Sequence, residues 1–404
     1  MAETEPGELR PGPKRTRWVA VTVVALTTIV VLALSIEAAA RLLYTESSTS
    51  TLECLILTDP TTGVRAKPNS VCLQKGFETR LTKYAFNSCG HRAGVECGEP
   101  KAADTRRIVL VGSSFAYGMW VEQDHSFAAL LPAELGRRTG LKIELYNEAM
   151  QWGTPHSVDL RFGEVLAAKP DIVLWALTPF DLDNVDLVIP WVPHQDADAT
   201  AHAAGGAAPP SPGLVRRIAD ALTKKSPVQF VEDAWSKLIA ALDETRTVFW
   251  LQHLLFKSQS QYVKSFLMRG ESADFLRTRN DPQLERSLAH FEAYLADVQA
   301  RAASVGAKVV VVMLPQRAQA AMISRNQWPA GFDPYRIGEE TRAVVLRQHA
   351  TYVDALHGFR AFPHAERAYL PVDGHINDEG HAIAARVLAD ALAPEVAAPV
   401  AAPH

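Results

Sequence analysis

The feature that most constrains the fold is an alternation of apolar strands and amphipathic helices that begins near residue 106. Residues 108–111 form an apolar, β-branched run that predicts a buried strand. A predicted helix (126–138, closed by Gly140), a strand (142–146), a helix (156–168) and a strand (171–176) follow in turn. Strands and helices that alternate at these lengths predict βαβ units and a parallel sheet, and therefore an α/β fold.

The alternation is interrupted between residues 194 and 280. Residues 194–213 are rich in Ala, Gly and Pro, which predicts a flexible excursion. Residues 214–270 have a helical pattern and carry an apolar stripe: Phe230, Trp235, Leu238, Phe249, Trp250, Leu254 and Leu255. We expect a helical insertion that packs on the core, with a substrate lid or a membrane-surface contact as the alternative.

The α/β pattern then resumes and continues to residue 393. It consists of a helix (281–304), strands (308–314 and 351–353) and a final helix (380–392). We therefore predict one α/β domain, 106–393, which residues 194–280 interrupt. Residues 394–404 are rich in Ala and Pro and are expected to be a disordered tail.

A run without charged residues extends from Trp18 to Ile36. At 1.5 Å per residue it gives about 28 Å of helix, enough to cross the hydrocarbon core of a bilayer. We predict a transmembrane helix at 18–40 and a tail at 1–17. Basic residues precede the run, and only one follows closely, so the tail is expected in the cytoplasm and the body outside: Arg10, Lys14, Arg15 and Arg17 against Arg41.

A cleaved signal peptide is the alternative for this segment, because Ala38, Ala39 and Ala40 could form a cleavage site. The apolar run is long for a signal peptide, which favours an uncleaved anchor. Either interpretation exports the body of the protein, to the periplasm or the outside of the cell. The near-balanced net charge of -4 gives no indication of nucleic-acid binding.

The chain has four cysteines, Cys54, Cys72, Cys89 and Cys97, and all lie in a lead-in segment at 41–105. An even number of cysteines in an exported segment predicts disulfides. Of the three possible pairings we favour Cys54–Cys72 with Cys89–Cys97, since each closes a short loop. No CxxC element occurs among them, which argues against a zinc site, and no cofactor is expected.

The first predicted strand ends on Gly112, Ser113 and Ser114. These residue types are common in turns, but a serine here would also lie where open α/β sheets place their active sites. A serine nucleophile needs a base and an acid that orients the base. Asp373 and His375 lie two residues apart just before the last helix, although this stretch could equally serve to cap that helix.

Together these blocks resemble the SGNH (GDSL-type) hydrolase superfamily. The serine block is VGSSFAYG (111–118), the Asp-His block is VDGHINDEGH (372–381), and FNSCGHRAG (86–94) resembles a segment upstream of the serine in exported members. The resemblance covers roughly residues 84–190 and 283–393. It implies a flavodoxin-like three-layer sandwich with Ser114 as nucleophile, His375 as general base and Asp373 as the acid that orients it.

The chain departs from the family pattern at three positions. Ser113 stands where the family usually has Asp, and Ala149 where a glycine is common. Phe180 replaces an asparagine whose side chain binds the oxyanion, and a phenyl ring cannot donate a hydrogen bond. The resemblance leaves the N–H groups of Ser114, Ala149 and Gly153 as oxyanion-hole candidates; Thr178 and Asn184 are possible substitutes for the missing amide.

The sequence thus predicts a membrane-anchored serine esterase that hydrolyses O-acyl esters, with acetyl favoured, outside the cytoplasmic membrane. From this location the expected substrate is an acyl ester of a cell-envelope polysaccharide or lipid. Two alternatives remain open. One is an O-acyltransferase that modifies an envelope glycan, and the other is a catalytically weak SGNH-like binding or scaffold protein.

Overall fold

The computed structural model describes residues 13–45, 47–48, 54–92, 96, 98–187, 245–268, 270–279 and 281–398. These residues belong to two compact units, which are described separately. The first unit contains the described residues of Met1–Thr45 and Ser211–Gln252. The second contains those of Glu46–Pro210 and His253–His404.

The second unit is built on a five-stranded sheet in which every pair of neighbours is parallel. Its strands lie in the order β10-β9-β8-β6-β7. Numbered along the chain, this is the flavodoxin-like order 2-1-3-4-5. The predicted parallel α/β sheet is confirmed, with strands β6 (Thr105–Gly112), β7 (Lys142–Asn147), β8 (Ile172–Leu177), β9 (Lys308–Met313) and β10 (Thr351–Asp354).

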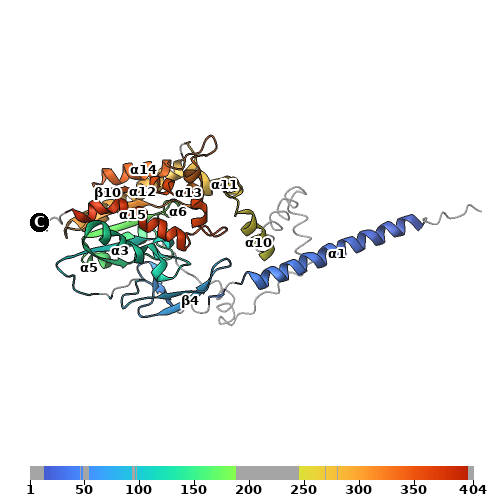
Figure 1. Cartoon of the computed structure of the whole chain (residues 1–404), viewed down its shortest axis with the longest axis horizontal. Helices are drawn as coiled ribbons and strands as arrows, with labels where there is room; N and C mark the ends of the chain where they lie inside the picture. Colours follow the sequence, from blue (N-terminus) through green and yellow to red (C-terminus); the bar gives the residue numbers. More distant parts are fainter. Residues whose placement is uncertain are drawn as a thin grey trace, which may run out of the picture. The chain divides into compact units, whose positions relative to one another are not determined.

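Helices cover both faces of this sheet (Figure 1). In β6, Ile108 and Leu110 face one hydrophobic cluster while Val109 and Val111 face the other, as expected of a strand buried on both sides. The first face is covered by α3 (Phe127–Thr139) and α15 (Asp378–Ala397). The second is covered by α4 (Pro155–Leu160), α5 (Phe162–Ala167), α12 (Pro282–Ala303) and α14 (Arg336–Arg347).

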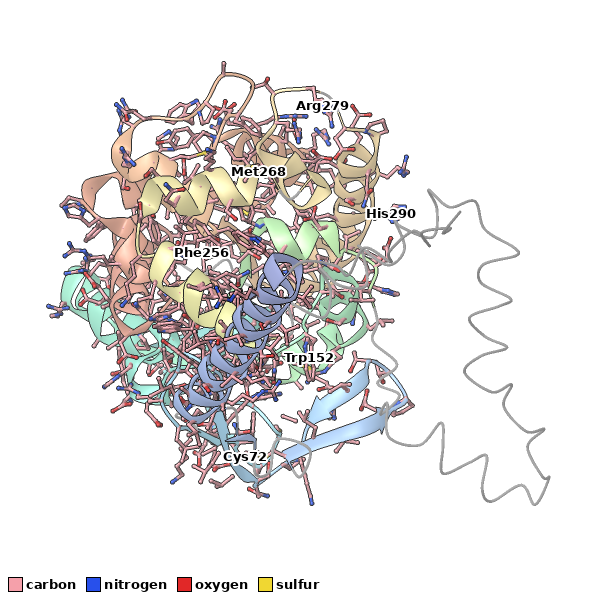
Figure 2. The ribbon with its side chains drawn as sticks, turned by 90° about the vertical axis from the view of Figure 1, so that its right-hand side faces the viewer. Cys72, Trp152, Phe256, Met268, Arg279 and His290 are labelled. Atoms are coloured by element: carbon pink, nitrogen blue, oxygen red, sulfur yellow. A yellow bond between two sulfur atoms is a disulfide. The ribbon has the colours of Figure 1, made fainter. Side chains whose placement is uncertain are left out.

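The remaining helices of this unit are short. They are α2 (Ser114–Tyr117), α6 (Pro179–Asp183), α11 (Gln259–Leu267), α13 (Arg317–Arg325), and the 3₁₀ helices Gln123–His125, Gly270–Leu276, His357–Ala361 and Ala365–Ala368. In Figure 2, Met268 directly follows α11, and Phe256 lies in the turn that precedes this helix. Two of these short helices, α2 and α6, begin just after strands β6 and β8, and both contribute residues to the lining of the site described below.

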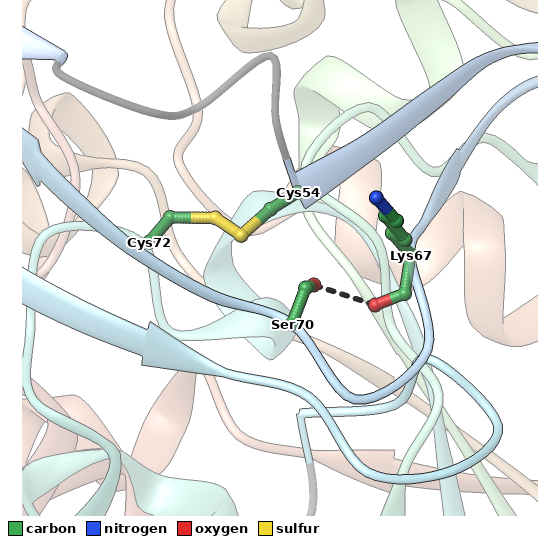
Figure 3. The surroundings of a disulfide bond; sticks show 4 residues. All are labelled: Cys54, Lys67, Ser70 and Cys72. Atoms are coloured by element: carbon green, nitrogen blue, oxygen red, sulfur yellow. Dashed lines mark hydrogen bonds between the residues drawn. A yellow bond between two sulfur atoms is a disulfide. The ribbon is translucent and has the colours of Figure 1, made fainter.

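The lead-in segment forms two small antiparallel sheets, one of β2 (Leu55–Asp59) with β3 (Gly63–Ala66), and one of β1 (Ser47–Ser48), β4 (Val71–Lys75) and β5 (Thr82–Ala85). Cys54 and Cys72 form a disulfide with a Cα–Cα distance of 6.1 Å, as predicted (Figure 3). Nearby, Ser70 Oγ donates a hydrogen bond to the Lys67 carbonyl at 2.6 Å. The second predicted pair stays a prediction, because Cys97 lies outside the described residues.

The structure corrects two helix boundaries. The predicted helix 156–168 is two helices, α4 and α5, which meet at Arg161. The predicted disordered tail begins too early, because α15 continues through Pro394 to Ala397. Val396 is 1% exposed, so apolar burial extends the helix past the point where the composition changes.

The predicted insertion is described only in part. Residues 194–213, Phe230, Trp235 and Leu238 lie outside the described residues. Within the described part of the stripe, Leu254 and Leu255 are 47% and 50% exposed, whereas Phe249 and Trp250 are partly buried. Tyr262 and Phe266 of α11 are buried against the core on the α12 face.

The first unit contains α1 (Pro13–Leu43), whose stretch Arg17–Leu43 is long and apolar enough to cross a membrane. A signal sequence passes the same test of length and composition. Near the end of α1, Glu37 accepts hydrogen bonds from the N–H groups of Arg246 and Thr247 at 3.1 and 2.9 Å. Those two residues begin helix α10 (Arg246–Leu255).

Candidate active site

Ser114 lies at the point where the strand order of the sheet reverses. Strands β6 and β8 are neighbours there, and open α/β sheets form a crevice outside the carboxyl ends of such strands. The end of β6 lies so close to β8 that only glycine fits at position 112. Gly112 has a φ of +149°, and a Cβ at this position would lie 2.3 Å from the Ala176 carbonyl oxygen. The sharp turn after Gly112 leaves Ser114 as the first residue of α2.

The structure brings Ser114, His375 and Asp373 into one hydrogen-bonded chain. His375 Nε2 lies 2.7 Å from Ser114 Oγ, and His375 Nδ1 lies 2.5 Å from Asp373 Oδ1. When Nδ1 carries the proton toward Asp373, Nε2 is free to accept the proton of the Ser114 hydroxyl. This arrangement can generate a serine nucleophile.

Asp373 is held from three directions. His375 contributes its ring and also its backbone N–H, which donates to Oδ1 at 3.0 Å. The Trp120 indole Nε1–H donates to the other oxygen, Oδ2, at 3.0 Å. Burial by itself would raise the pKa of Asp373, but the hydrogen bonds from His375 and Trp120 outweigh it and hold that pKa below its usual value.

Of the three oxyanion-hole candidates, two N–H groups are already engaged in their own loop. The Ala149 N–H donates to Asn147 Oδ1 at 3.1 Å, and the Gly153 N–H donates to the Met150 carbonyl at 3.0 Å. The N–H of Ser114 makes no bond within α2, because Ser114 is the first residue of that helix. Of the three candidates, Ser114 is therefore the one whose N–H is not already used in a hydrogen bond within its own loop or helix.

A buried carboxyl group supports the turn beneath Ser114. Asp181 is 2% exposed, and its Oδ2 accepts hydrogen bonds from the N–H and the hydroxyl of Thr178 at 2.5 and 3.0 Å. Burial raises the pKa of Asp181 to about 6, although the Ser113 hydroxyl and Thr178 act in the opposite direction. Because the Thr178 hydroxyl already donates to Asp181, Thr178 is a poor substitute for the missing asparagine.

A pocket of about 520 Å³ opens beside Ser114 and His375. Phe180 lies on its wall, 58% exposed, and Asn184 lines it as well. Partial desolvation and the neighbouring carboxylates of Asp281 and Asp274 raise the pKa of Asp183, another lining residue, to about 7. The wall also includes aromatic and amide side chains: Phe115, Tyr262, Phe266, Gln283 and Gln316.

Sequence reasoning missed two residues that contact the triad, Trp120 and Glu78. The Glu78 carboxylate accepts the N–H groups of Val372 and Asp373 at 2.9 and 2.7 Å. Trp120 lies just after the serine block, and nothing in its type or spacing indicates that it reaches residue 373. Glu78 lies in the lead-in, about 300 residues away along the chain, and carries no motif.

The described residues contain no cluster of three or more His, Cys, Asp or Glu side chains that could hold a metal ion. His381, which follows the Asp-His block, is fully buried, and its Nδ1 accepts the Phe127 N–H at 3.1 Å. Burial lowers the pKa of His381 to about 3, so this histidine is a neutral structural link between α15 and α3.

No protein-family model and no curated protein matches the chain. Similar solved structures include an alpha/beta hydrolase from the metagenome of Lake Arreo, 15% identical, which covers 73% of this chain and 97% of that one with a TM-score of 0.36. An acetyl-xylooligosaccharide esterase from Geobacillus is 13% identical over 71% of this chain and 94% of its own, also with a TM-score of 0.36. A lipase/acylhydrolase from Enterococcus faecalis is 12% identical (72% and 96% covered, TM-score 0.36), and others are described as candidate SGNH and GDSL-type hydrolases.

Proposed function

We propose that this protein is an SGNH-type serine hydrolase that cleaves O-acyl esters, with short acyl groups such as acetyl favoured. The observation that carries the proposal is the continuous chain from Ser114 Oγ through His375 to Asp373, with distances of 2.7 and 2.5 Å, at the mouth of a pocket. A serine that only stabilises a turn does not require a histidine at its hydroxyl, nor a carboxylate that binds the other ring nitrogen of that histidine.

In the proposed reaction His375 takes the Ser114 proton as Oγ attacks the ester carbonyl carbon. The protonated His375, stabilised by Asp373, then gives that proton to the departing alcohol oxygen, which leaves an acyl-serine. Water next attacks the acyl-serine with His375 again as base, which releases the carboxylic acid and restores Ser114. The N–H of Ser114 contributes to stabilising the oxyanion in both steps.

We further propose that the body acts outside the cytoplasmic membrane, with α1 as a single-pass anchor and the N-terminus in the cytoplasm. The apolar stretch Arg17–Leu43, the basic residues before it and the disulfide Cys54–Cys72 support this location. An acyl ester of an envelope polysaccharide or lipid is the substrate class that this location favours.

Two alternatives keep specific support. In an O-acyltransferase, a sugar hydroxyl replaces water in the second step, and the amide and aromatic side chains of the pocket suit such an acceptor. In a weak or non-catalytic binding protein, Phe180 occupies the pocket wall where the family has an amide donor.

Hydrolysis of p-nitrophenyl acetate by the full-length protein in detergent tests the proposal. We expect Ser114→Ala and His375→Ala each to lower the turnover by at least about 10³-fold, with unchanged thermal unfolding. The control Ser304→Ala, at the exposed end of α12, should hydrolyse at the wild-type rate. If the Ser114→Ala protein keeps wild-type turnover, the assignment is wrong; if added sugars divert the acetyl group from water, the transferase alternative is favoured.

A further inference from the structure

Trp120 adopts an unusual backbone conformation for a large side chain. Its φ is +69°, in the left-handed region that non-glycine residues rarely occupy. Such conformations persist where the surroundings impose them, and they gather at functional sites. Here the Trp120 N–H donates to the Tyr84 hydroxyl at 2.8 Å, while its indole Nε1–H donates to Asp373 Oδ2 at 3.0 Å. The strained backbone therefore directs the indole at the acid of the triad.

The turn between β4 and β5 packs against that indole. This turn comprises residues 76–81, and we call it the lead-in turn. A Cβ at Gly76 would lie 3.2 Å from the Trp120 ring, so the backbone of the lead-in turn already touches the indole. The lead-in turn thus limits where the Trp120 ring can move.

Glu78, in the same turn, holds the backbone of Asp373. Its side chain is 1% exposed, and Oε1 accepts the N–H groups of both Val372 and Asp373. Its other oxygen, Oε2, lies 2.8 Å from His253 Nδ1. A buried carboxylate is costly unless it is hydrogen-bonded in this way, and replacing it would release two backbone N–H groups of the loop that carries Asp373 and His375.

Arg92 fixes the segment that carries Trp120. Its buried guanidinium donates to the carbonyls of Tyr117, Gly118 and Val121, which lie on both sides of Trp120. It also stacks over the Tyr84 ring, with 4.4 Å from Cζ to the ring centroid. Through Arg92, the lead-in is therefore hydrogen-bonded to the backbone both before and after Trp120.

The Asp-His loop, residues 370–377, is an irregular turn with two internal backbone hydrogen bonds: the Leu370 N–H donates to the His375 carbonyl at 2.8 Å, and the Gly374 N–H donates to the Leu370 carbonyl at 3.2 Å. Residues 370–377 contain no helix or strand; an isolated bridge joins Tyr369 to Ile376, and Gly374 has a φ of +87°. An orienting acid must be held to within about half an ångström of its productive position. The contacts that fix Asp373 beyond His375 come from Glu78 and Trp120.

We propose that the lead-in is a working part of the catalytic centre, in which Glu78 and Trp120 are positioning residues that orient Asp373 toward His375. This inference rests on the proposed function but concerns residues that the Ser-His-Asp assignment does not include. Both act through Asp373 and touch no reacting atom.

The first test compares Trp120→Phe with the wild type. A fluorophosphonate reports on the nucleophile without any knowledge of the substrate, so its rate of labelling Ser114 in the full-length protein is the first readout. We expect Trp120→Phe to lower that rate at least tenfold. The matched control Trp328→Phe removes a partly buried indole that packs on Tyr335, away from Ser114, and should keep the wild-type rate.

The second readout is the downfield proton NMR signal of the hydrogen shared between His375 Nδ1 and Asp373, which does not depend on activity. We expect the signal in the wild type and in Trp328→Phe, and its loss or upfield movement in Trp120→Phe. A wild-type signal with a wild-type labelling rate in Trp120→Phe would overturn the positioning role. A signal present in a wild type that fails to label would instead count against the proposed function alone.

Glu78 supplies a second pair of variants in case Trp120→Phe folds poorly. Glu78→Gln keeps an oxygen that can accept the N–H groups of Val372 and Asp373, whereas Glu78→Ala removes it. We expect Glu78→Gln to retain at least half of the wild-type labelling rate and Glu78→Ala to lose at least 90% of it. Equal rates in the two variants would overturn the claim that Glu78 acts by holding the Asp-His loop.

Discussion

Ser113 explains how the turn before Ser114 tolerates a buried acid beneath it. Asp181 is buried there with a pKa raised to about 6, and the Ser113 hydroxyl is one of the groups that moderate this increase. An aspartate at position 113 would bring a second carboxylate to the same buried place, where two like charges repel. A neutral hydroxyl at 113 avoids this repulsion and donates a hydrogen bond to Asp181.

We predict that Ser113→Asp destabilises the fold by about 1–3 kcal/mol at pH 7. The loss should be smaller at pH 5. A carboxyl group whose pKa is raised by folding binds its proton more tightly in the folded state, so its penalty appears as the pH rises through that pKa. Thermal unfolding at both pH values checks this, with the uncharged Ser113→Asn as control. An equal loss at pH 5 and pH 7 would show that size, not charge, is responsible.

Phe180 is the second residue with a direct consequence for rate. It lies exposed on the pocket wall at the start of α6, where an amide side chain could donate a hydrogen bond toward the oxyanion. A single oxyanion donor typically changes the rate by about 10²–10³-fold. We predict that Phe180→Asn raises the turnover of p-nitrophenyl acetate at least tenfold, whereas Phe180→Leu does not. An unchanged rate in Phe180→Asn would mean that the oxyanion is bound elsewhere.

At this scale the sequence predicts those site residues that belong to local motifs. Ser114, Asp373 and His375 follow from a strand end and a short block before a helix. Trp120 and Glu78 do not, because their role depends on a long-range approach of the lead-in to residue 373. The engaged N–H groups of Ala149 and Gly153 likewise depend on a loop conformation that residue types do not specify.

At the scale of elements, α15 and α3 are joined by a buried histidine. His381 Nδ1 accepts the Phe127 N–H at the first turn of α3, and burial lowers the pKa of His381 to about 3. In the unfolded chain the same group takes up its proton near its ordinary pKa of 6.5. The stability that depends on neutral His381 is therefore present above pH 6.5 and is lost as the pH falls toward 3.

We predict that this group alone costs about 2 kcal/mol of unfolding free energy between pH 7 and pH 5. His381→Gln keeps an oxygen that can accept the Phe127 N–H but does not titrate, so it should lose less stability over that interval than the wild type. Unfolding curves at the two pH values measure the difference. His91, whose burial lowers its pKa to about 4, acts in the same direction in both proteins and cancels in the comparison.

The disulfide Cys54–Cys72 joins the start of the first lead-in sheet to β4, which precedes the lead-in turn. It closes a loop of 18 residues, for which chain entropy gives about 3 kcal/mol. We predict that the double variant Cys54→Ser/Cys72→Ser unfolds at a lower temperature and labels Ser114 more slowly, since the lead-in contacts Asp373. A lower unfolding temperature with an unchanged labelling rate would show that the disulfide stabilises the fold but does not affect the reactivity of Ser114.

The elements themselves were largely predictable because strands buried on both faces give continuous apolar runs. Strands β6, β8 and β9 are such runs, and their ends differ from the predicted ones by a few residues at most. Helices α13 and α14 were missed because Gln, Arg and Glu make them polar overall, although their apolar residues keep a helical spacing. The break at Arg161 was also missed; the capping box of Thr154 and Ser157 fixes where α4 starts but leaves no mark in the periodicity where it ends.

At the scale of the whole molecule, we predict a membrane-anchored enzyme with an exported body. Helix α1 has the length and composition to cross a bilayer, but the same features suit a cleaved signal. Mass spectrometry of the N-terminus, combined with protease treatment of intact spheroplasts, distinguishes them. We expect an intact N-terminus and a body that external protease degrades. A body protected from protease in unbroken spheroplasts would contradict the proposed orientation.

The measurement that most directly tests the central claim is fluorophosphonate labelling of the full-length protein, with the modified residue mapped by mass spectrometry. We predict one labelled residue, Ser114, with labelling abolished in His375→Ala and retained in Trp328→Phe. No labelling of a well-folded wild-type protein, or equal labelling in His375→Ala, would show that the hydrogen-bonded chain Ser114–His375–Asp373 does not activate a nucleophile.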